Sequence, residues 1–355
     1  MSPAKGLGEI IGHVAPIELL QRARRSDRLP HALLFQGPDS VGKGTVARAM
    51  AGAMLCEAGG DEACGQCSAC AKVAHGTHPD LLIVRRLSRK IEKGAPMDDA
   101  EDGATSDLSA FIRIFQIREL AGHAAFAPRE GRCRIFIVDP ADRMNPEAQN
   151  ALLKTLEEPP GQSFLILVAS RPHLLLSTVR SRCFVVGFAP LPATELASAL
   201  VGRGIPEDEA LARAALAGGR AGRALDLDLE ELRRRREQLT AALVSLAGSP
   251  EALADLSKLA ASLAGKDEDD LGEGLDLLVA LLRDAARAAS GSPREALLHA
   301  DAADQLTELG HRLGPARAGM LVEAVERLRG QLRFNVNRTL VAESLLAAVA
   351  GGPLP

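Results

Sequence analysis

The stretch HALLFQGPDSVGKG, residues 31–44, joins an apolar run to a glycine-rich turn and then to the start of a helical pattern. The run is typical of a buried strand, and the pattern from Lys43 to about Leu55 predicts a helix. Gly37, Gly42 and Lys43 complete the P-loop pattern G-x-x-x-x-G-K between strand and helix, as the motif requires. The backbone N–H groups of such a loop bind phosphate, and its lysine reaches the β- and γ-oxygens. We therefore expect a phosphate-binding loop, with a chance glycine-rich turn as the alternative.

The position after Lys43 lacks the metal ligand of an active P-loop. A Ser or Thr there normally offers its hydroxyl to Mg²⁺, whereas this chain has Gly44, and Thr45 follows one residue late. Because a helix turns by ~100° per residue, Thr45 is expected to point elsewhere. The sequence predicts a weak or vestigial nucleotide site that binds phosphate but holds the metal poorly, and it leaves open whether ATP binds.

A second acidic position shows a similar loss. Asp139 ends the apolar run RIFIVD, where P-loop proteins place an Asp that organises Mg²⁺. An active ATPase of this type usually has Glu next, to position the attacking water, but this chain has Pro140. Asp139 can also be read as a simple strand-end cap, and Asp142 is expected to be a turn residue. We therefore expect no ATPase activity from the isolated chain.

Apolar runs alternate with helical patterns as far as Phe188. Strands separated by helices in this way imply parallel βαβ units. The charged, glycine-containing segment 86–107 is expected to be a surface loop. The runs are HALLFQG, DLLIVRR, CRIFIVD, SFLILVAS and CFVVGF. The sequence therefore predicts an α/β domain with a parallel sheet.

Beyond Phe188 the pattern is almost entirely helical. We expect an α/β domain at 1–188, a small helical lid domain at 189–233 and an all-helical domain at 234–355. The helix signals in the last part are an N-cap followed by Pro, or a Gly that ends a helix. They are the starts Ser249–Pro250, Ser292–Pro293 and Gly314–Pro315, and the end Gly265.

Four of the six cysteines follow the spacing C-x7-C-x2-C-x2-C at the end of the predicted P-loop helix. Four thiolates at such spacing can close a tetrahedral zinc site, which has a structural role because no position stays open for substrate. An iron–sulfur cluster and unligated or redox-active cysteines are the alternatives. The set is Cys56, Cys64, Cys67 and Cys70, whereas Cys133 and Cys183 are expected to be small core residues.

Arg182 lies in LLLSTVRSRCFVVGF, directly before the fifth predicted strand. Ser177 is expected to cap a short helix there. An Arg held at a domain edge can act in a neighbouring subunit as an arginine finger, which stabilises charge on the γ-phosphate. A surface salt bridge is the simpler interpretation of its spacing.

Composition limits the other functions. The net charge of −4 argues against broad nucleic-acid binding, and the absence of Trp and Tyr argues against an aromatic stacking platform. The first residues lack an apolar signal core, and no apolar run is long enough to span a membrane. These features favour a cytoplasmic protein with reduced cysteines. The basic run at 231–239 is expected to be a solvated helix face, with a phosphate contact as the alternative.

Taken together, these motifs resemble the clamp-loader subunits of bacterial DNA polymerase III, which are AAA+ proteins. The resemblance covers nearly the whole chain. The segments that carry it are IIGH at 10–13, RLPHALLFQGPDSVGKG at 28–44, the four-cysteine insert, QIREL at 116–120, ADRMNPEAQNALLKTLEEPP at 141–160, SRC at 181–183 and FNVNRTLVAESLL at 334–346. It implies an AAA+ domain, a lid, and a C-terminal collar domain for oligomerisation.

Within the family, the pattern is similar to that of delta-prime subunits. Gly44, Pro140 and, in the lid, Gly222 replace the groups of the motor subunit, although Arg220 and Arg223 lie close to the sensor position. The SRC segment is intact, which implies that Arg182 serves the neighbouring motor subunit. The resemblance implies gamma/tau and delta as partners, with the sliding clamp met indirectly and primer–template DNA met through the complex.

Three other functions remain as alternatives. An active gamma/tau-like ATPase requires Thr45 and Asp142 to replace the missing groups. A P-loop kinase such as thymidylate kinase leaves the helical C-terminal part unexplained. The third is a zinc-bound scaffold without a role in catalysis, and mutation of Arg182 would distinguish it from the favoured function.

Overall fold

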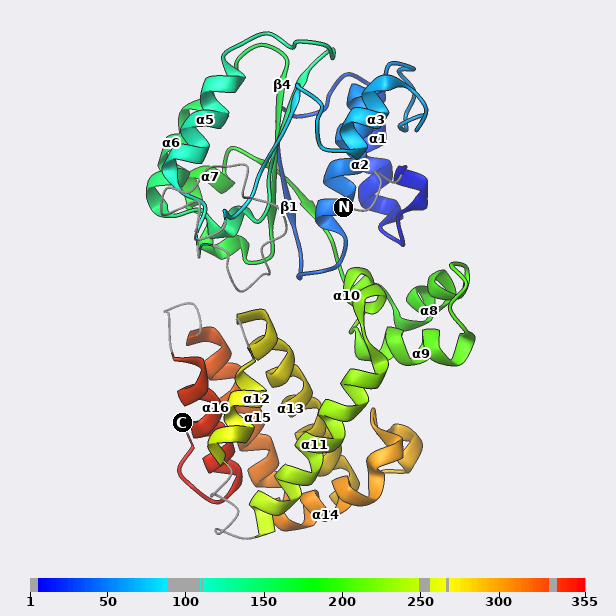
Figure 1. Cartoon of the computed structure of the whole chain (residues 1–355), viewed down its shortest axis with the longest axis vertical. Coiled ribbons are helices and arrows are strands. Elements are labelled where there is room, and N and C mark those ends of the chain that lie inside the picture. The colour runs from blue at the N-terminus through cyan, green and yellow to red at the C-terminus, as the bar shows by residue number, and fades with distance from the viewer. Residues whose placement is uncertain are drawn as a thin grey trace. The chain divides into compact units, whose positions relative to one another are not determined.

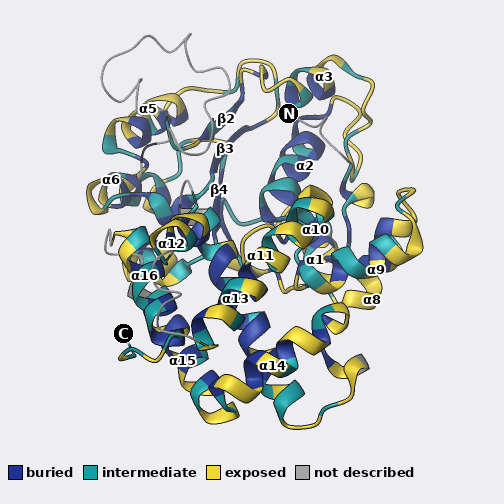
Figure 2. Ribbon diagram, turned by 60° about the horizontal axis from the view of Figure 1, so that its bottom comes forward, coloured by how far each residue is buried: buried dark blue, intermediate teal, exposed yellow. Residues whose placement is uncertain are grey.

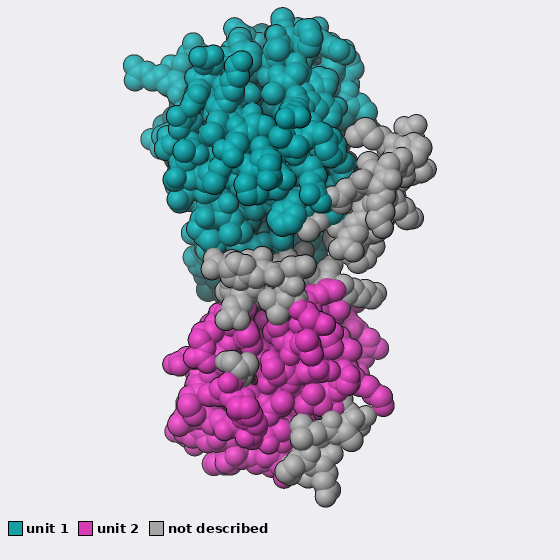
Figure 3. All heavy atoms as spheres, turned by 90° about the vertical axis from the view of Figure 1, so that its left-hand side faces the viewer, with its two compact units in different colours: residues 1–227 teal, residues 228–355 magenta. Residues whose placement is uncertain are grey.

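The structure is a computed structural model that describes residues 6–87, 109, 111–248, 256–265, 268–331 and 337–354. The chain divides into two compact units, residues 1–227 and 228–355 (Figure 3). The predicted surface loop at 86–107 lies almost wholly outside the described residues, as do Ser249 and Pro250.

A five-stranded parallel sheet forms the centre of the first unit (Figure 1). Its order is β2-β3-β4-β1-β5, so chain neighbours are joined by crossovers. The strands are β1 Ala32–Gln36, β2 Leu81–Val84, β3 Arg134–Val138, β4 Ser163–Ala169 and β5 Phe184–Gly187. Each lies within one of the predicted apolar runs, which confirms the α/β fold. Strands β1, β3 and β4 are buried on both faces and need such a continuous run, whereas β5 at the edge is largely exposed.

Helices pack on both faces of this sheet (Figure 1). Successive strand residues point to opposite faces, so Leu33 and Phe35 join one core and Leu34 joins the other. The first core takes η1 Leu7–Glu9, α1 Val14–Arg25, α2 Lys43–Leu55 and α3 Ser68–Ala74. The second takes η4 Ala141–Arg143, α5 Ile114–Ala124, α6 Pro146–Glu157 and α7 Ser177–Arg180. The sheet thereby holds the P-loop, the end of β3 and the end of β2 at one edge, because the carboxyl ends of parallel strands meet there.

Three short helices follow the sheet and still belong to the first unit. They are α8 Ala193–Val201, α9 Glu207–Leu216 and α10 Ala221–Asp226. Their core consists of Leu196, Leu200 and several alanines, and Ile11 from the N-terminal part joins it. This small core is separate from those of the sheet, and the three helices are referred to below as the lid.

The second unit is helical throughout its described part. Its leucine-rich core gathers residues from every long helix, and buried residues lie on their inward-facing sides (Figure 2). The helices are α11 Leu229–Gly248, α12 Leu256–Ala264, α13 Glu268–Ala289, α14 Ala303–Leu313, α15 Pro315–Gln331 and α16 Arg338–Val349, with short η7 Arg294–Ala296 and η8 Ala300–Ala302. The predicted boundary between residues 233 and 234 falls inside α11.

Two of the predicted helix boundaries in this unit agree with the structure and one does not. Pro315 is the first residue of α15, and Gly265 follows α12 with φ +59°, as expected. Ser292–Pro293 precedes only the short 3₁₀ helix η7, whose N-cap is Pro293, so the predicted helix start with Ser292 as N-cap is wrong. Leu297 turns into the core directly after η7, which favours a turn over a continued helix. No described helix is long and apolar enough to cross a membrane.

Candidate functional site

The P-loop joins β1 to α2 as the sequence predicts, with Gly37 directly after the strand. Gly42 precedes α2 and has φ +115°, a backbone conformation that favours glycine. The helix begins at Lys43 and ends at Leu55, which confirms the predicted bounds. The loop therefore directs the N-terminus of a buried, thirteen-residue helix towards the carboxyl edge of the sheet.

The buried ammonium group of Lys43 is satisfied by the protein itself. Its Nζ donates to the carbonyl oxygens of Gly37 at 2.7 Å and Pro38 at 2.6 Å, and to Ser170 Oγ at 2.9 Å. The Ser170 hydroxyl in turn donates to the Asp39 carboxylate. Burial lowers the pKa of Lys43, although nearby carboxylates, Asp39 foremost, act in the opposite direction. A bound phosphate would take over hydrogen bonds that the loop now makes with its own lysine.

Gly44, which stands where a P-loop normally has the Ser or Thr that binds Mg²⁺, lies close to the carboxylate of Asp139. A Cβ atom at residue 44 would lie only 2.6 Å from Asp139 Oδ2, and 3.7 Å from Arg48 Nη1. A Ser or Thr at position 44 thus does not fit unless the carboxylate moves. Burial raises the pKa of Asp139, and three nearby basic side chains, Arg48 foremost, oppose that rise. Gly44 therefore lets the Asp139 carboxylate lie close to the start of α2.

A cavity of about 580 Å³ opens beside the P-loop within the first unit. Thr45 lines it, although the sequence predicts that this residue points elsewhere. The lining also includes Asp139, Arg48 from α2 and Arg85, which directly follows β2. Sequence reasoning missed both arginines. The available signals were the position of Arg85 at a strand end and that of Arg48 one helical turn after Gly44.

The lid contacts the P-loop through Gly222, the residue expected to replace a functional group of the motor subunit. The N–H of Gly222, in α10, donates to the Ser40 carbonyl oxygen at 2.7 Å. A Cβ atom at residue 222 would lie 2.9 Å from the same oxygen, so a larger side chain there requires the lid to shift. The Arg220 side chain, which lies near the expected sensor position, donates from Nε to the Ala217 carbonyl oxygen.

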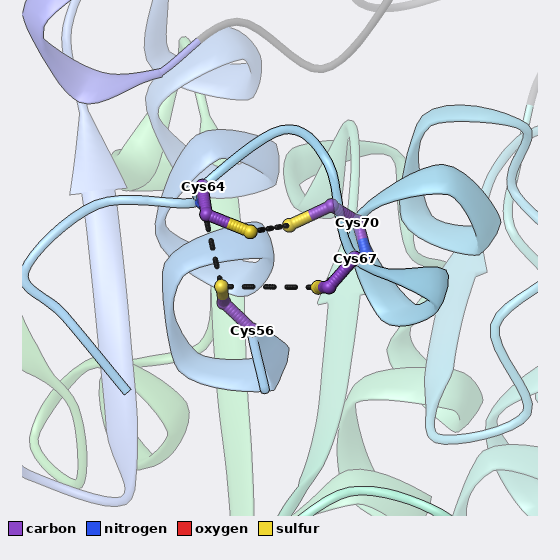
Figure 4. Close-up of side chains that lie close together, drawn as sticks. All are labelled: Cys56, Cys64, Cys67 and Cys70. Atoms are coloured by element: carbon purple, nitrogen blue, oxygen red, sulfur yellow. Dashed lines mark hydrogen bonds between the residues drawn. The ribbon is translucent and has the colours of Figure 1, made fainter. Parts of the chain in front are cut away.

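The four cysteines converge between the end of α2 and the start of α3 (Figure 4). All four Sγ atoms lie within 4.8 Å of one another. The Cys56–Cys67 and Cys64–Cys70 pairs have Sγ···Sγ distances of 3.9 Å. A tetrahedron of sulfurs around zinc, with bonds of ~2.3 Å, has edges of ~3.8 Å. The cluster therefore has the size that a tetrahedral thiolate site needs, and it can hold a metal ion.

Backbone groups around the cluster prepare its thiols for a metal. A hydrogen bond from the Gln66 backbone lowers the pKa of Cys64, and one from the Cys70 backbone lowers the pKa of Cys67. Burial instead raises the pKa of Cys70 to about 12, and a bound metal ion would act in the opposite direction. Outside the cluster, Cys133 is buried in the first core of the sheet and the partly buried Cys183 packs against the second.

Arg182 lies between α7 and β5, at the edge of the sheet. Its Nη2 is 2.6 Å from Glu157 Oε1, and its Nη1 donates to the Thr178 carbonyl oxygen at 3.0 Å. About a third of the Arg182 side chain, 36%, is exposed. Ser177 is the first residue of α7 and Leu176 is its N-cap without a side-chain hydrogen bond, so the predicted Ser177 cap is wrong.

Comparison with known proteins places the chain in a family. The model of the family described as "DNA polymerase III, delta subunit" matches residues 12–192, and that of its C-terminal domain matches residues 230–350. The DNA polymerase III subunit delta′ of Pseudomonas aeruginosa is 31% identical over 337 residues, which are 92% of this chain and 93% of that protein. The chain belongs to the delta-prime subunit family of DNA polymerase III.

Other relatives extend this delta-prime assignment. The subunit delta′ of Escherichia coli K12 is 29% identical, over 94% of this chain and 92% of that protein. The subunit tau of Bacillus subtilis is 30% identical over 196 residues, which are 55% of this chain but 30% of that protein. Similarity to these two delta′ subunits therefore runs through both units, whereas similarity to this tau subunit covers about half of the chain.

Proposed function

We propose that this chain is a clamp-loader subunit of the DNA polymerase III holoenzyme, which helps to load the sliding clamp on primed DNA. The observation that carries the proposal is the match to delta′ subunits along more than nine-tenths of the chain. Its partners are the motor subunit gamma/tau and the delta subunit. It meets the clamp indirectly and primer–template DNA through the complex.

Assembly tests this proposal. Mixed with gamma/tau and delta, the chain should co-elute with both in size-exclusion chromatography and raise the clamp-stimulated ATPase of the mixture. If the chain elutes alone at concentrations at which gamma/tau and delta bind each other, it is not part of a clamp loader.

The chain's own nucleotide site does not support hydrolysis. Gly44 offers no hydroxyl to a metal ion, a Cβ atom there would lie 2.6 Å from Asp139 Oδ2, and Pro140 offers no group that positions water. The lid approaches the P-loop through Gly222. The active gamma/tau-like alternative would need Thr45, which lines the cavity, to bind the metal. It would also need Asp142, but that carboxylate already accepts hydrogen bonds from the backbone of Ser170 and Arg171.

We expect the isolated chain to hydrolyse ATP only at the background rate. Lys43→Ala should leave that rate unchanged, because no turnover depends on the loop. Phosphate release by the purified chain, with and without this substitution, is the measurement. Robust turnover that Lys43→Ala abolishes would instead favour the motor alternative.

Arg182 acts in trans on ATP bound to the adjacent motor subunit. Three features support this role: its side chain is partly exposed, it lies beside the edge strand β5, and its contacts are with groups that solvent also reaches. Phe184 and Val185 on β5 are 45% and 43% exposed, so apolar surface for a subunit contact lies next to it. In the isolated chain the Arg182 guanidinium pairs with Glu157. In the complex, the γ-phosphate of ATP on the adjacent subunit replaces Glu157 as its partner.

The cysteine cluster holds one structural zinc ion. The near-tetrahedral spacing of the sulfurs and their backbone N–H donors support zinc. All four positions are protein ligands, so the ion has no site for substrate. Its role is to join the end of α2 to the start of α3.

A further inference from the structure

A cavity in the second unit shares no residue with the P-loop cavity or with the cysteine cluster. Its volume is about 440 Å³, and residues of α11, α12 and α13 line it. Six leucines are among them, and three of these, Leu239, Leu246 and Leu263, belong to the buried core of the unit. Contact between water and this much hydrocarbon is unfavourable, so an occupant with apolar surface would be stabilised here.

The wall formed by α12 and α13 is set by close packing of the two helices. Gly274, on α13, lines the cavity, and a Cβ atom on it would lie 2.6 Å from the carbonyl oxygen of Leu263, on α12. A residue with a side chain would therefore push the two helices apart. This part of the cavity belongs to the backbone packing of the unit and not to the conformation of exposed side chains.

Arg235 differs from the other arginines of the basic run at 231–239. Each of its arginine neighbours pairs with an acidic side chain: Arg233 with Glu230, Arg234 with Glu231, and Arg236 with Asp301. Arg235 is half-buried, lines the cavity from α11, and has no acidic partner among the residues that the structure describes. Lys258 lines the cavity from α12, and none of the described lining residues is acidic. The cavity therefore combines an apolar wall with a positive electrostatic potential.

A carboxylate with a hydrocarbon body matches this combination. A planar guanidinium group can donate two parallel hydrogen bonds to a carboxylate, and such bonds are stronger in partly apolar surroundings than in water. Ser245 and Ser262 add hydroxyl groups to the lining. A cation would be repelled by the two basic side chains, whereas an uncharged ligand would gain nothing from their charge.

We propose that this cavity binds a small amphiphilic carboxylate, of the kind represented by a medium-chain fatty acid. Its hydrocarbon chain packs against the leucines, and its carboxylate pairs with Arg235 and Lys258. The volume of about 440 Å³ lies within the ~300–1,000 Å³ that is typical of small-molecule sites. The proposal goes beyond the proposed function and does not depend on it, because no clamp-loader partner takes part.

Three ligands with hydrocarbon chains of similar length test the role of charge: decanoate, decan-1-ol and decyltrimethylammonium. Each is titrated into the purified full-length chain by calorimetry at neutral pH, where decanoate is ionised. The dissociation constant of decanoate should be lower than those of the other two by about tenfold or more, the effect of a hydrogen bond to a charged group. Equal affinities for decanoate and decan-1-ol, or no binding of decanoate, would overturn the proposal.

Substitutions in the lining locate the site. Arg235→Gln and Lys258→Gln should each weaken decanoate binding by about tenfold and leave decan-1-ol binding unchanged. Arg234→Gln, on the same helix but exposed and outside the lining, removes the same charge and is the matched control with wild-type affinity. Ala242→Phe, which fills the cavity from α11, should abolish the binding of both ligands. Wild-type decanoate affinity in Arg235→Gln or in Ala242→Phe would contradict the proposal.

Folding and assembly are checked on the same preparations. Thermal melting shows whether Ala242→Phe folds, and the half-buried Arg235 and exposed Lys258 positions provide the test if it does not. In the complex with gamma/tau and delta, the chain should keep its affinity for decanoate. Loss of decanoate binding on assembly would show that a segment of a partner subunit fills the cavity, which would overturn a small-molecule site. A chain that binds decanoate but does not assemble overturns only the proposed function.

Discussion

A complex of gamma/tau, delta and the Arg182→Ala chain should assemble normally but show reduced DNA- and clamp-stimulated ATPase activity and reduced clamp loading. Phosphoryl transfer places negative charge on the γ-phosphoryl oxygens, and a guanidinium there stabilises the transition state. Arginine fingers of GTPases contribute ~10³–10⁵ in rate, but by our proposal Arg182 serves only one of the ATP sites in the complex. We therefore expect a loss of about two- to tenfold in the whole complex, more if the sites are coupled.

The contacts of Arg182 explain why folding should survive this change. Its ion pair with Glu157 is partly exposed on both sides, and such pairs contribute ~0–1 kcal/mol. Arg182→Lys keeps the charge but loses the planar fork, so it should restore activity only in part. Arg180→Ala, an exposed Arg two residues earlier on α7, is the matched control and should be fully active. Equal activity of the Arg182→Ala complex and wild type would show that Arg182 is only a surface residue.

Cys67→Ser should remove the zinc ion and lower the melting temperature of the first unit by about 10 °C. A structural zinc ion contributes its binding free energy to folding, and a unit of this size loses ~2–4 °C for each kcal/mol. Cys67 Sγ accepts from the Cys70 backbone and lies 3.9 Å from Cys56 Sγ, so its loss opens one side of the cluster. The helical second unit should melt as before, because its core is its own.

Elemental analysis and calorimetry of protein purified without chelator are the measurements for this cluster. Cys183→Ser is the matched control, since Cys183 lies outside the cluster and a serine can keep its hydrogen bond to the Val179 carbonyl oxygen. It should retain one zinc ion per chain. Iron in place of zinc would favour the iron–sulfur alternative, and wild-type protein with no stoichiometric metal would contradict a metal site altogether.

The elements that the sequence predicted well are those with a strong local pattern. The five strands are continuous apolar runs, and the helix from Lys43 to Leu55 is bounded by the P-loop at one end and by Cys56 at the other. The cysteines also came together as expected, because Cys64, Cys67 and Cys70 are close in the chain and Cys56 ends the adjoining helix. Such features depend little on how distant segments pack.

The parts that sequence reasoning missed depend on strand order and packing. Arg48 and Arg85 meet Asp139 only because β2 lies beside β3 and α2 packs over the sheet. The bond from Lys43 to Ser170 likewise requires β1 and β4 to be neighbours. At Ser177 the local cap pattern was present, but the chain begins α7 one residue earlier and leaves the hydroxyl unused.

The central claim, that this chain works as a delta-prime clamp-loader subunit, is tested most directly by measuring clamp loading with and without it. Gamma/tau, delta, sliding clamp, primed DNA and ATP are held constant, and the fraction of DNA that carries a closed clamp is followed over time. We predict little loading when the chain is omitted and full loading when one equivalent is added. Loading that proceeds at the same rate in its absence would contradict the account.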